Sequence, residues 1–150
     1  FLSLIGSFIG LPHRLEKIIE NNKLLVINNS KATNLDSTLK SISNYSNIYL
    51  IIGGRAKENN FASLANFNKN ISKCYIIGES SNFIYDQINS SIDSKISLNL
   101  NNAIKEIFLE LRSTKMKSTI LFSPGCSSFD QFKNFEDRGN KFREIIKNHF

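Results

Sequence analysis

Short apolar runs that end in small or polar residues recur along this 150-residue chain. Runs of this length and ending are typical of strands that helices cover on both faces. They predict six strands, at 15–20, 24–28, 48–52, 74–77, 96–100 and 119–122. Only Asn21-Asn22 separates the first two runs, and asparagine tolerates the positive φ of a tight turn, so we expect an antiparallel hairpin there.

Between the later strands the apolar spacing becomes helical. Leu35, Leu39 and Ile42 fall on one face of a helix predicted over 34–45. The same spacing predicts helices at 81–90, 102–111 and 135–149. The alternation indicates an α/β fold with a doubly wound, Rossmann-like sheet of about six strands, mostly parallel, with one antiparallel strand from the N-terminal hairpin.

Length and composition fit one ordinary globular domain. Hydrophobic residues make up 41% of the chain and charged residues 21%, and no apolar stretch is long enough for a transmembrane helix, so we expect no membrane partner. The net charge is +6, but the lysines are scattered singly without interleaved aromatic residues, so we expect no nucleic-acid partner. A site for a small anion suits these cations better.

Cysteine and histidine residues give no sign of a metal site. Cys74 and Cys126 lie far apart, and neither His13 nor His149 is near them in sequence. We expect both cysteines to be reduced, buried thiols of a cytoplasmic protein.

The start of the chain is apolar but lacks the basic region and cleavage site of a signal peptide. The first residue is Phe1 rather than Met. We therefore expect residues 1–10 to be the tail of a preceding domain or linker, and residues 11–150 to be a single domain.

In doubly wound sheets, ligand sites lie beyond the carboxyl ends of the strands. After the second strand, Lys31 falls close to a helix N-terminus that Thr33 or Asn34 would cap, a place where a cation is unfavourable unless an anion binds there. After the third strand, Gly53-Gly54 precedes Arg55 and Lys57. Neither GxxxxGK[ST] nor GxGxxG occurs anywhere.

Four segments together carry a family resemblance. They are Leu11-Pro12-His13-Arg14, the run NNSKATN at 28–34, Gly53-Gly54 with Lys57, and the run SFDQFKNFEDRG at 128–139. In this order and spacing they resemble the carboxy-terminal domain of the Mur ligases, in the branch that adds D-glutamate. The resemblance covers nearly the whole chain from about residue 10 onward.

The resemblance implies a reaction. ATP, with Mg²⁺, phosphorylates the carboxylate of UDP-N-acetylmuramoyl-L-alanine, and the amine of D-glutamate attacks the acyl phosphate. ATP and Mg²⁺ would be held mainly by a central domain that this chain lacks, so we expect the chain alone to be inactive. The resemblance also implies a cytoplasmic protein, and we expect a monomer.

Roles are implied by position in the motifs. Arg14 would contact the nucleotide base region, Asn29 the ribose, and Lys31 both the phosphates and the incoming amino acid. D-glutamate would be surrounded by Lys31, Thr33, Lys57, Ser128, the Phe129 backbone and Phe135. Two cations and several neutral donors suit a dicarboxylate. The resemblance assigns no catalytic residue and no metal ligand to this domain.

The chain departs from the family pattern at two places. Asn29 stands where the family usually has Asp, which removes a charge-assisted hydrogen bond to the ribose. Arg55-Ala56 replaces a small acidic pair before Lys57. Two alternatives stay open: a same-fold domain of another Mur or folylpolyglutamate-type ligase, and a free-standing anion- or nucleotide-binding α/β module.

Overall fold

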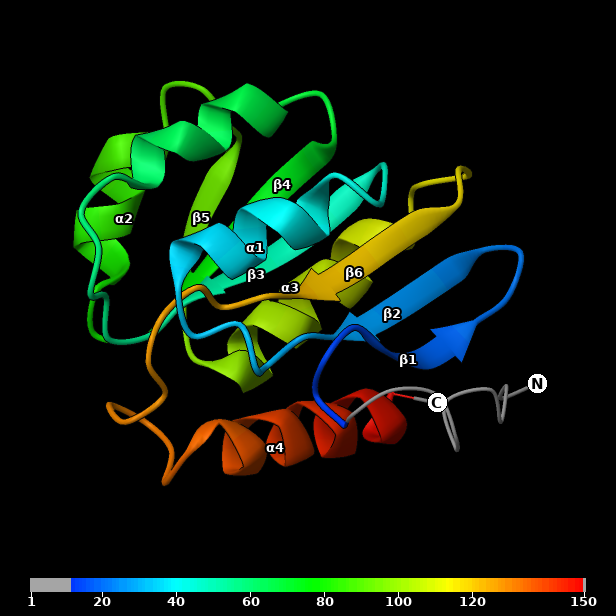
Figure 1. The fold of residues 1–150 in the computed structure, drawn as a ribbon. Coiled ribbons are helices and arrows are strands. Elements are labelled where there is room, and N and C mark those ends of the chain that lie inside the picture. The colour runs from blue at the N-terminus through cyan, green and yellow to red at the C-terminus, as the bar shows by residue number, and fades with distance from the viewer. Residues whose placement is uncertain (1–11, 150) are drawn as a thin grey trace.

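A computed structural model describes residues 12–149 and shows a central six-stranded sheet with helices on both faces (Figure 1). The strands are β1 (Glu16–Glu20), β2 (Leu24–Asn28), β3 (Ile48–Gly53), β4 (Ile71–Ile77), β5 (Ser94–Leu98) and β6 (Ser118–Phe122). Their order across the sheet is β1-β2-β6-β3-β4-β5. Only β1 and β2 pair antiparallel, so the predicted fold class is confirmed.

The two faces of the sheet carry different helices. On one face lie α1 (Leu35–Ile42), the 3-10 helix η2 (Phe61–Phe67) and α2 (Ser81–Ile88), and on the other α3 (Leu100–Leu111) and α4 (Phe135–Asn148). Alternate residues of each central strand point to opposite faces. In β3, Leu50 and Ile52 therefore pack under α1 and α2, whereas Tyr49 and Ile51 pack against α3 and α4.

Local signals explain most of the helix starts. Asn34 caps α1, because its Oδ1 accepts a hydrogen bond from the Ser37 N–H at 2.9 Å. Asn99 and Asn134 cap α3 and α4 in the same way. In the hairpin turn, Asn21 Oδ1 accepts from the N–H groups of Lys23 and Leu24, which confirms the turn predicted at Asn21-Asn22.

Several predicted boundaries were wrong. The fourth strand begins at Ile71, three residues earlier than predicted, and the fifth covers Ser94–Leu98 rather than 96–100. Because Asn99 caps α3, that helix begins at Leu100, where the prediction still placed strand. The 3-10 helix η2 was not predicted. The prediction of a separate segment at residues 1–10 lies outside the described residues.

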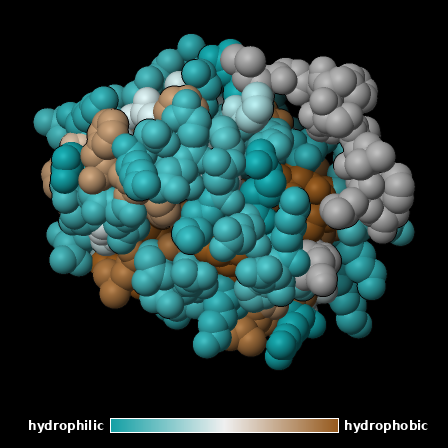
Figure 2. Space-filling view, turned by 90° about the horizontal axis from the view of Figure 1, so that it is seen from below, coloured by the Kyte–Doolittle hydropathy of each residue, from teal (hydrophilic) through white to brown (hydrophobic). Residues whose placement is uncertain are grey.

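The surface on the α4 side is mostly hydrophilic, with hydrophobic residues showing in separate patches (Figure 2). Among the described residues no helix is long and apolar enough to cross a membrane. Both cysteines are buried free thiols, as predicted, and burial raises the pKa of each.

Candidate functional site

The segments that follow β2 and β6 meet at the carboxyl edge of the sheet, because β6 lies directly beside β2. A hollow of about 470 Å³ opens there between the loop before β1, the segment after β2 and helix α1. Its lining residues include Arg14, Asn29 and Lys31. The structure therefore brings together the three residues that the sequence predicted on the nucleotide side, and adds Lys40 as a further cation.

Asn29 forms the floor of this hollow and is only 6% exposed. Its Oδ1 accepts from the Leu15 N–H at 3.0 Å, and its Nδ2 donates to Ser123 Oγ at 3.1 Å. The amide thus ties the loop that carries Arg14 to the end of β6. A carboxylate cannot donate, so with the usual Asp at this position the hydrogen bond to Ser123 would have to be donated by the serine hydroxyl.

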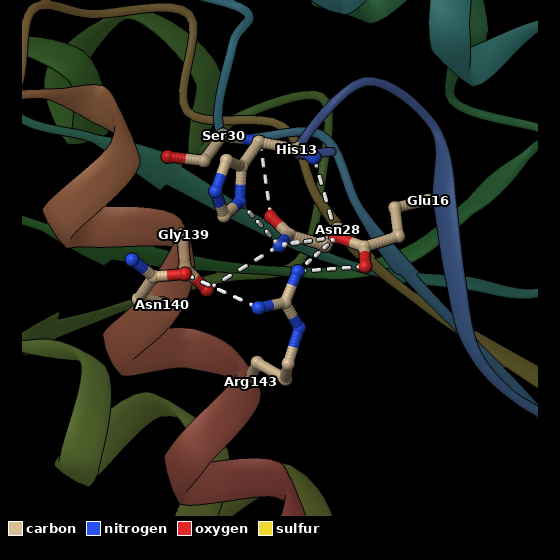
Figure 3. Close-up of polar contacts among 7 residues, drawn as sticks. All are labelled: His13, Glu16, Asn28, Ser30, Gly139, Asn140 and Arg143. Carbon is tan, nitrogen blue, oxygen red and sulfur yellow. Dashed lines mark hydrogen bonds and ion pairs between the residues drawn. The ribbon is translucent and has the colours of Figure 1, made fainter. Parts of the chain in front are cut away.

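The loop that carries Arg14 is fixed by a buried polar cluster, shown in Figure 3. Asn28 is fully buried, and its Nδ2 lies 3.0 Å from His13 Nδ1, 3.2 Å from Glu16 Oε1 and 3.3 Å from the Gly139 carbonyl oxygen. Arg143, from α4, contacts both Glu16 carboxylate oxygens, at 2.7 and 2.6 Å. Strand β2, the loop before β1 and α4 are therefore joined around Asn28.

The cluster also fixes the state of the His13 ring. Asn28 Oδ1 accepts from the Ser30 N–H, so the amide nitrogen faces His13 Nδ1. An amide nitrogen only donates, so this geometry favours the neutral ring in which Nδ1 accepts and Nε2 carries the proton. Burial, followed by the charge of Arg143, lowers the pKa of His13, in agreement with this geometry.

On the predicted amino-acid side, Lys31 and Phe135 lie together, with Lys31 Nζ 4.9 Å from the centre of the Phe135 ring. Ser30 Oγ donates to the Phe135 carbonyl oxygen at 2.8 Å. Lys31 also lines the hollow, so it lies between the residues predicted for the nucleotide and those predicted for the amino acid.

Ser128 and Phe129 lie on the loop between β6 and α4. Ser128 is buried, the Phe129 side chain is 63% exposed, and the Phe129 N–H donates to Ser127 Oγ at 3.3 Å. The loop is anchored on its far side, because Asp130 Oδ2 accepts from the Glu79 N–H and Gln131 Nε2 donates to the Leu98 carbonyl oxygen, each at 2.9 Å.

The remaining two predicted residues, Thr33 and Lys57, are less tightly placed. Thr33 is half-buried between β2 and α1, and Lys57 is exposed on the loop after β3. Within residues 12–149 no hydrogen bond or ion pair joins either side chain to the other predicted site residues. Next to Lys57, Glu58 has a buried Oε1 without a hydrogen-bond partner among the described residues.

The glycines at the end of β3 stand where a side chain would clash with neighbouring backbone. A Cβ on Gly53 would overlap the backbone of Ile77, and one on Gly54 would lie 2.5 Å from the Ser127 carbonyl oxygen. These two positions let β3 approach β4 and the loop after β6 closely. Arg55 then pairs with Glu79 at 3.0 Å.

Sequence reasoning missed the residues that hold the site segments in place. Arg138 is the clearest example: it is 1% exposed and reaches the segments after both β2 and β6. It was visible only as part of the run ending in Arg138-Gly139. Its position three residues after Phe135 and four before Phe142, on the apolar stripe of α4, was the available signal.

Two solved structures illustrate which proteins share this fold. Folylpolyglutamate synthase from Thermotoga maritima matches 96% of this chain and 32% of its own with a TM-score of 0.58 at 14% identity. MurF from Acinetobacter baumannii matches 91% of this chain and 31% of its own with a TM-score of 0.61 at 12% identity. These likenesses define the fold as the domain that Mur ligases and folylpolyglutamate synthase share.

No protein-family model matches the chain. Its relatives by sequence nevertheless point to one kind of ligase. UDP-N-acetylmuramoylalanine–D-glutamate ligase of Wolbachia sp. subsp. Brugia malayi (strain TRS) is 44% identical over 143 residues, which cover 95% of this chain and 29% of that enzyme. The enzyme of that name from Bartonella henselae is 40% identical over 143 residues, covering 95% and 31%. The resemblance is confirmed: this chain is a homologue of these ligases over a span consistent with their carboxy-terminal domain.

Proposed function

We propose that this chain is the amino-acid-binding, carboxy-terminal domain of an ATP-dependent ligase that adds D-glutamate to UDP-N-acetylmuramoyl-L-alanine in peptidoglycan precursor synthesis. One observation supports it most: Lys31 lines the hollow with Arg14 and Asn29 and also lies over the Phe135 ring. A single cation thus stands where the phosphates of a nucleotide and a carboxylate-bearing amino acid would meet.

The proposed roles are those that the motif resemblance implies. Arg14 and Asn29 bound the hollow for the base and ribose of ATP, and Lys31 balances negative charge on the transferred phosphoryl group. Ser128, Thr33, Lys57, Phe135 and the Phe129 backbone surround D-glutamate. In the reaction the substrate carboxylate takes the γ-phosphoryl group, the amine attacks the acyl carbon, and the amide forms as phosphate leaves.

The described residues fit a nucleotide better than a metal ion. The hollow offers three cations, Arg14, Lys31 and Lys40, as partners for phosphates. Among residues 12–149 no group of three or more His, Cys, Asp or Glu side chains could hold a metal. Mg²⁺ would be bound elsewhere in the longer protein, and the isolated chain is expected to release no phosphate from ATP.

Lys31→Ala, made in the full-length protein that contains this chain, tests the shared role. Removing one fixed cation from the transferring phosphoryl group is expected to lower kcat/KM by about 10²-fold or more. Steady-state phosphate release, with ATP and D-glutamate varied in turn, measures the effect. Lys23→Ala, an exposed cation at the opposite end of β2, is the matched control. Equal kcat/KM values for Lys31→Ala and wild type would show that Lys31 takes no part in the reaction.

A further inference from the structure

A buried arginine joins the segments that the proposed function assigns to D-glutamate. Arg138, in the first turn of α4, is 1% exposed. Its Nε donates to Ser30 Oγ at 3.0 Å, its Nη2 to the Ser30 carbonyl oxygen at 2.6 Å and its Nη1 to the Cys126 carbonyl oxygen at 2.9 Å. One guanidinium therefore bridges the segment after β2 and the loop after β6.

Each of these contacts lies within two residues of a predicted D-glutamate contact. Ser30 precedes Lys31 directly, and Cys126 lies two residues before Ser128. Ser30 Oγ, which accepts from Arg138, also donates to the carbonyl oxygen of Phe135. The guanidinium thus contacts the chain one residue before Lys31 and two residues before Ser128, and it reaches the Phe135 carbonyl through the Ser30 hydroxyl.

Among the described residues no carboxylate contacts this guanidinium directly. Burial lowers the pKa of Arg138 to about 10, so the group is still charged at neutral pH. Burying a cation without an acid costs stability. The planar fork of donors is what a neutral side chain or a lysine cannot reproduce.

We propose that Arg138 is a positioning residue for D-glutamate: it holds the Lys31 segment and the Ser128 loop at the separation that the amino acid requires. This inference rests on the proposed function. It gives Arg138 a structural role in addition to its place in the run at 128–139. The role is argued for the amino-acid side because, among the described residues, Arg138 makes no hydrogen bond to Arg14 or Asn29, and its second anchor, Cys126, lies on the loop that carries Ser128.

Kinetics of the full-length protein test this role. Arg138→Ala and Arg138→Lys are expected to raise the KM for D-glutamate by about 10-fold or more, since small misplacements of positioning groups cost up to 10²-fold. The KM for ATP is expected to rise less than the KM for D-glutamate, because Asn29 keeps its contacts to Leu15 and Ser123 while Lys31 belongs to both sides. Lys141→Ala, an exposed cation of the same helix, is expected to match wild type.

Ser30→Ala is the milder second variant if Arg138 variants do not fold. It removes the hydroxyl that joins Arg138 to Phe135 and leaves the Nη2 contact to the Ser30 carbonyl. We expect the same selective rise in the KM for D-glutamate, of smaller size. An unchanged KM for D-glutamate in a folded variant, or a parallel rise of both KM values, would overturn the inference. A wild-type protein that does not use D-glutamate would instead contradict the proposed function.

Discussion

At the scale of single residues, the site depends on polar side chains whose partners come from distant parts of the chain. Asn28, at the end of β2, contacts His13 in the loop before β1 and the Gly139 carbonyl of α4. Asn29 joins the same loop to the segment that follows β6. Such residues look like ordinary loop or strand-end residues in the sequence. Asn29 and Lys31 follow the carboxyl end of β2, where doubly wound sheets place their ligands, whereas Arg14 precedes β1 and was predicted from the motif resemblance.

The neutral ring of His13 makes stability depend on pH. Its pKa in the folded chain is lowered from 6.5, so the unfolded chain takes up a proton first as the pH falls. The contribution of His13 is therefore fully present above pH 6.5 and is lost as the pH falls below it. We expect the free energy of unfolding to drop by at most about 1.4 kcal/mol per pH unit from this residue.

Urea unfolding between about pH 8 and pH 5 measures this dependence. His13→Gln is expected to flatten the slope below pH 6.5. A slope that is unchanged in His13→Gln would show that another group titrates.

At the scale of elements, strands were easier to predict than the segments that join them. Short apolar runs, some of them interrupted by polar residues, identified all six strands. The polar pair Ser72-Lys73 hid the first residues of β4 from this pattern. The helix η2 carries Phe61 and Leu64 three residues apart, which is too short a stripe to separate from a loop. The docking of α4 depends on side chains from β1 and β2, which no local pattern could show.

Substitution of Gly139 tests how closely α4 must approach the loop before β1. A Cβ at this position would overlap the buried His13 ring. In an open helix Gly→Ala stabilises by up to about 1 kcal/mol. Here we expect Gly139→Ala to destabilise the chain by about 1–3 kcal/mol through overpacking.

Denaturant unfolding measures whether Gly139→Ala lowers or raises the free energy of unfolding. Lys141→Ala, at an exposed site on the same helix, is the control. A Gly139→Ala variant as stable as wild type, or more stable, would mean that α4 does not pack against His13 at this distance.

At the scale of the whole molecule, the domain presents cations and hydroxyls at one edge of its sheet and has no phosphate-binding loop in its sequence. Its relatives are about three times as long. The fold alone does not choose an amino acid, because folylpolyglutamate synthase and MurF share it. The choice of D-glutamate therefore rests on the sequence relatives and on the placement of Lys31 beside Phe135.

The most direct test is phosphate release by the full-length protein that contains this chain, supplied with ATP, Mg²⁺ and UDP-N-acetylmuramoyl-L-alanine. Release is expected to require D-glutamate, with one amide product formed per phosphate, and L-glutamate is expected to give only background. Release that D-glutamate fails to stimulate, while L-glutamate or a diamino acid does, would contradict the account.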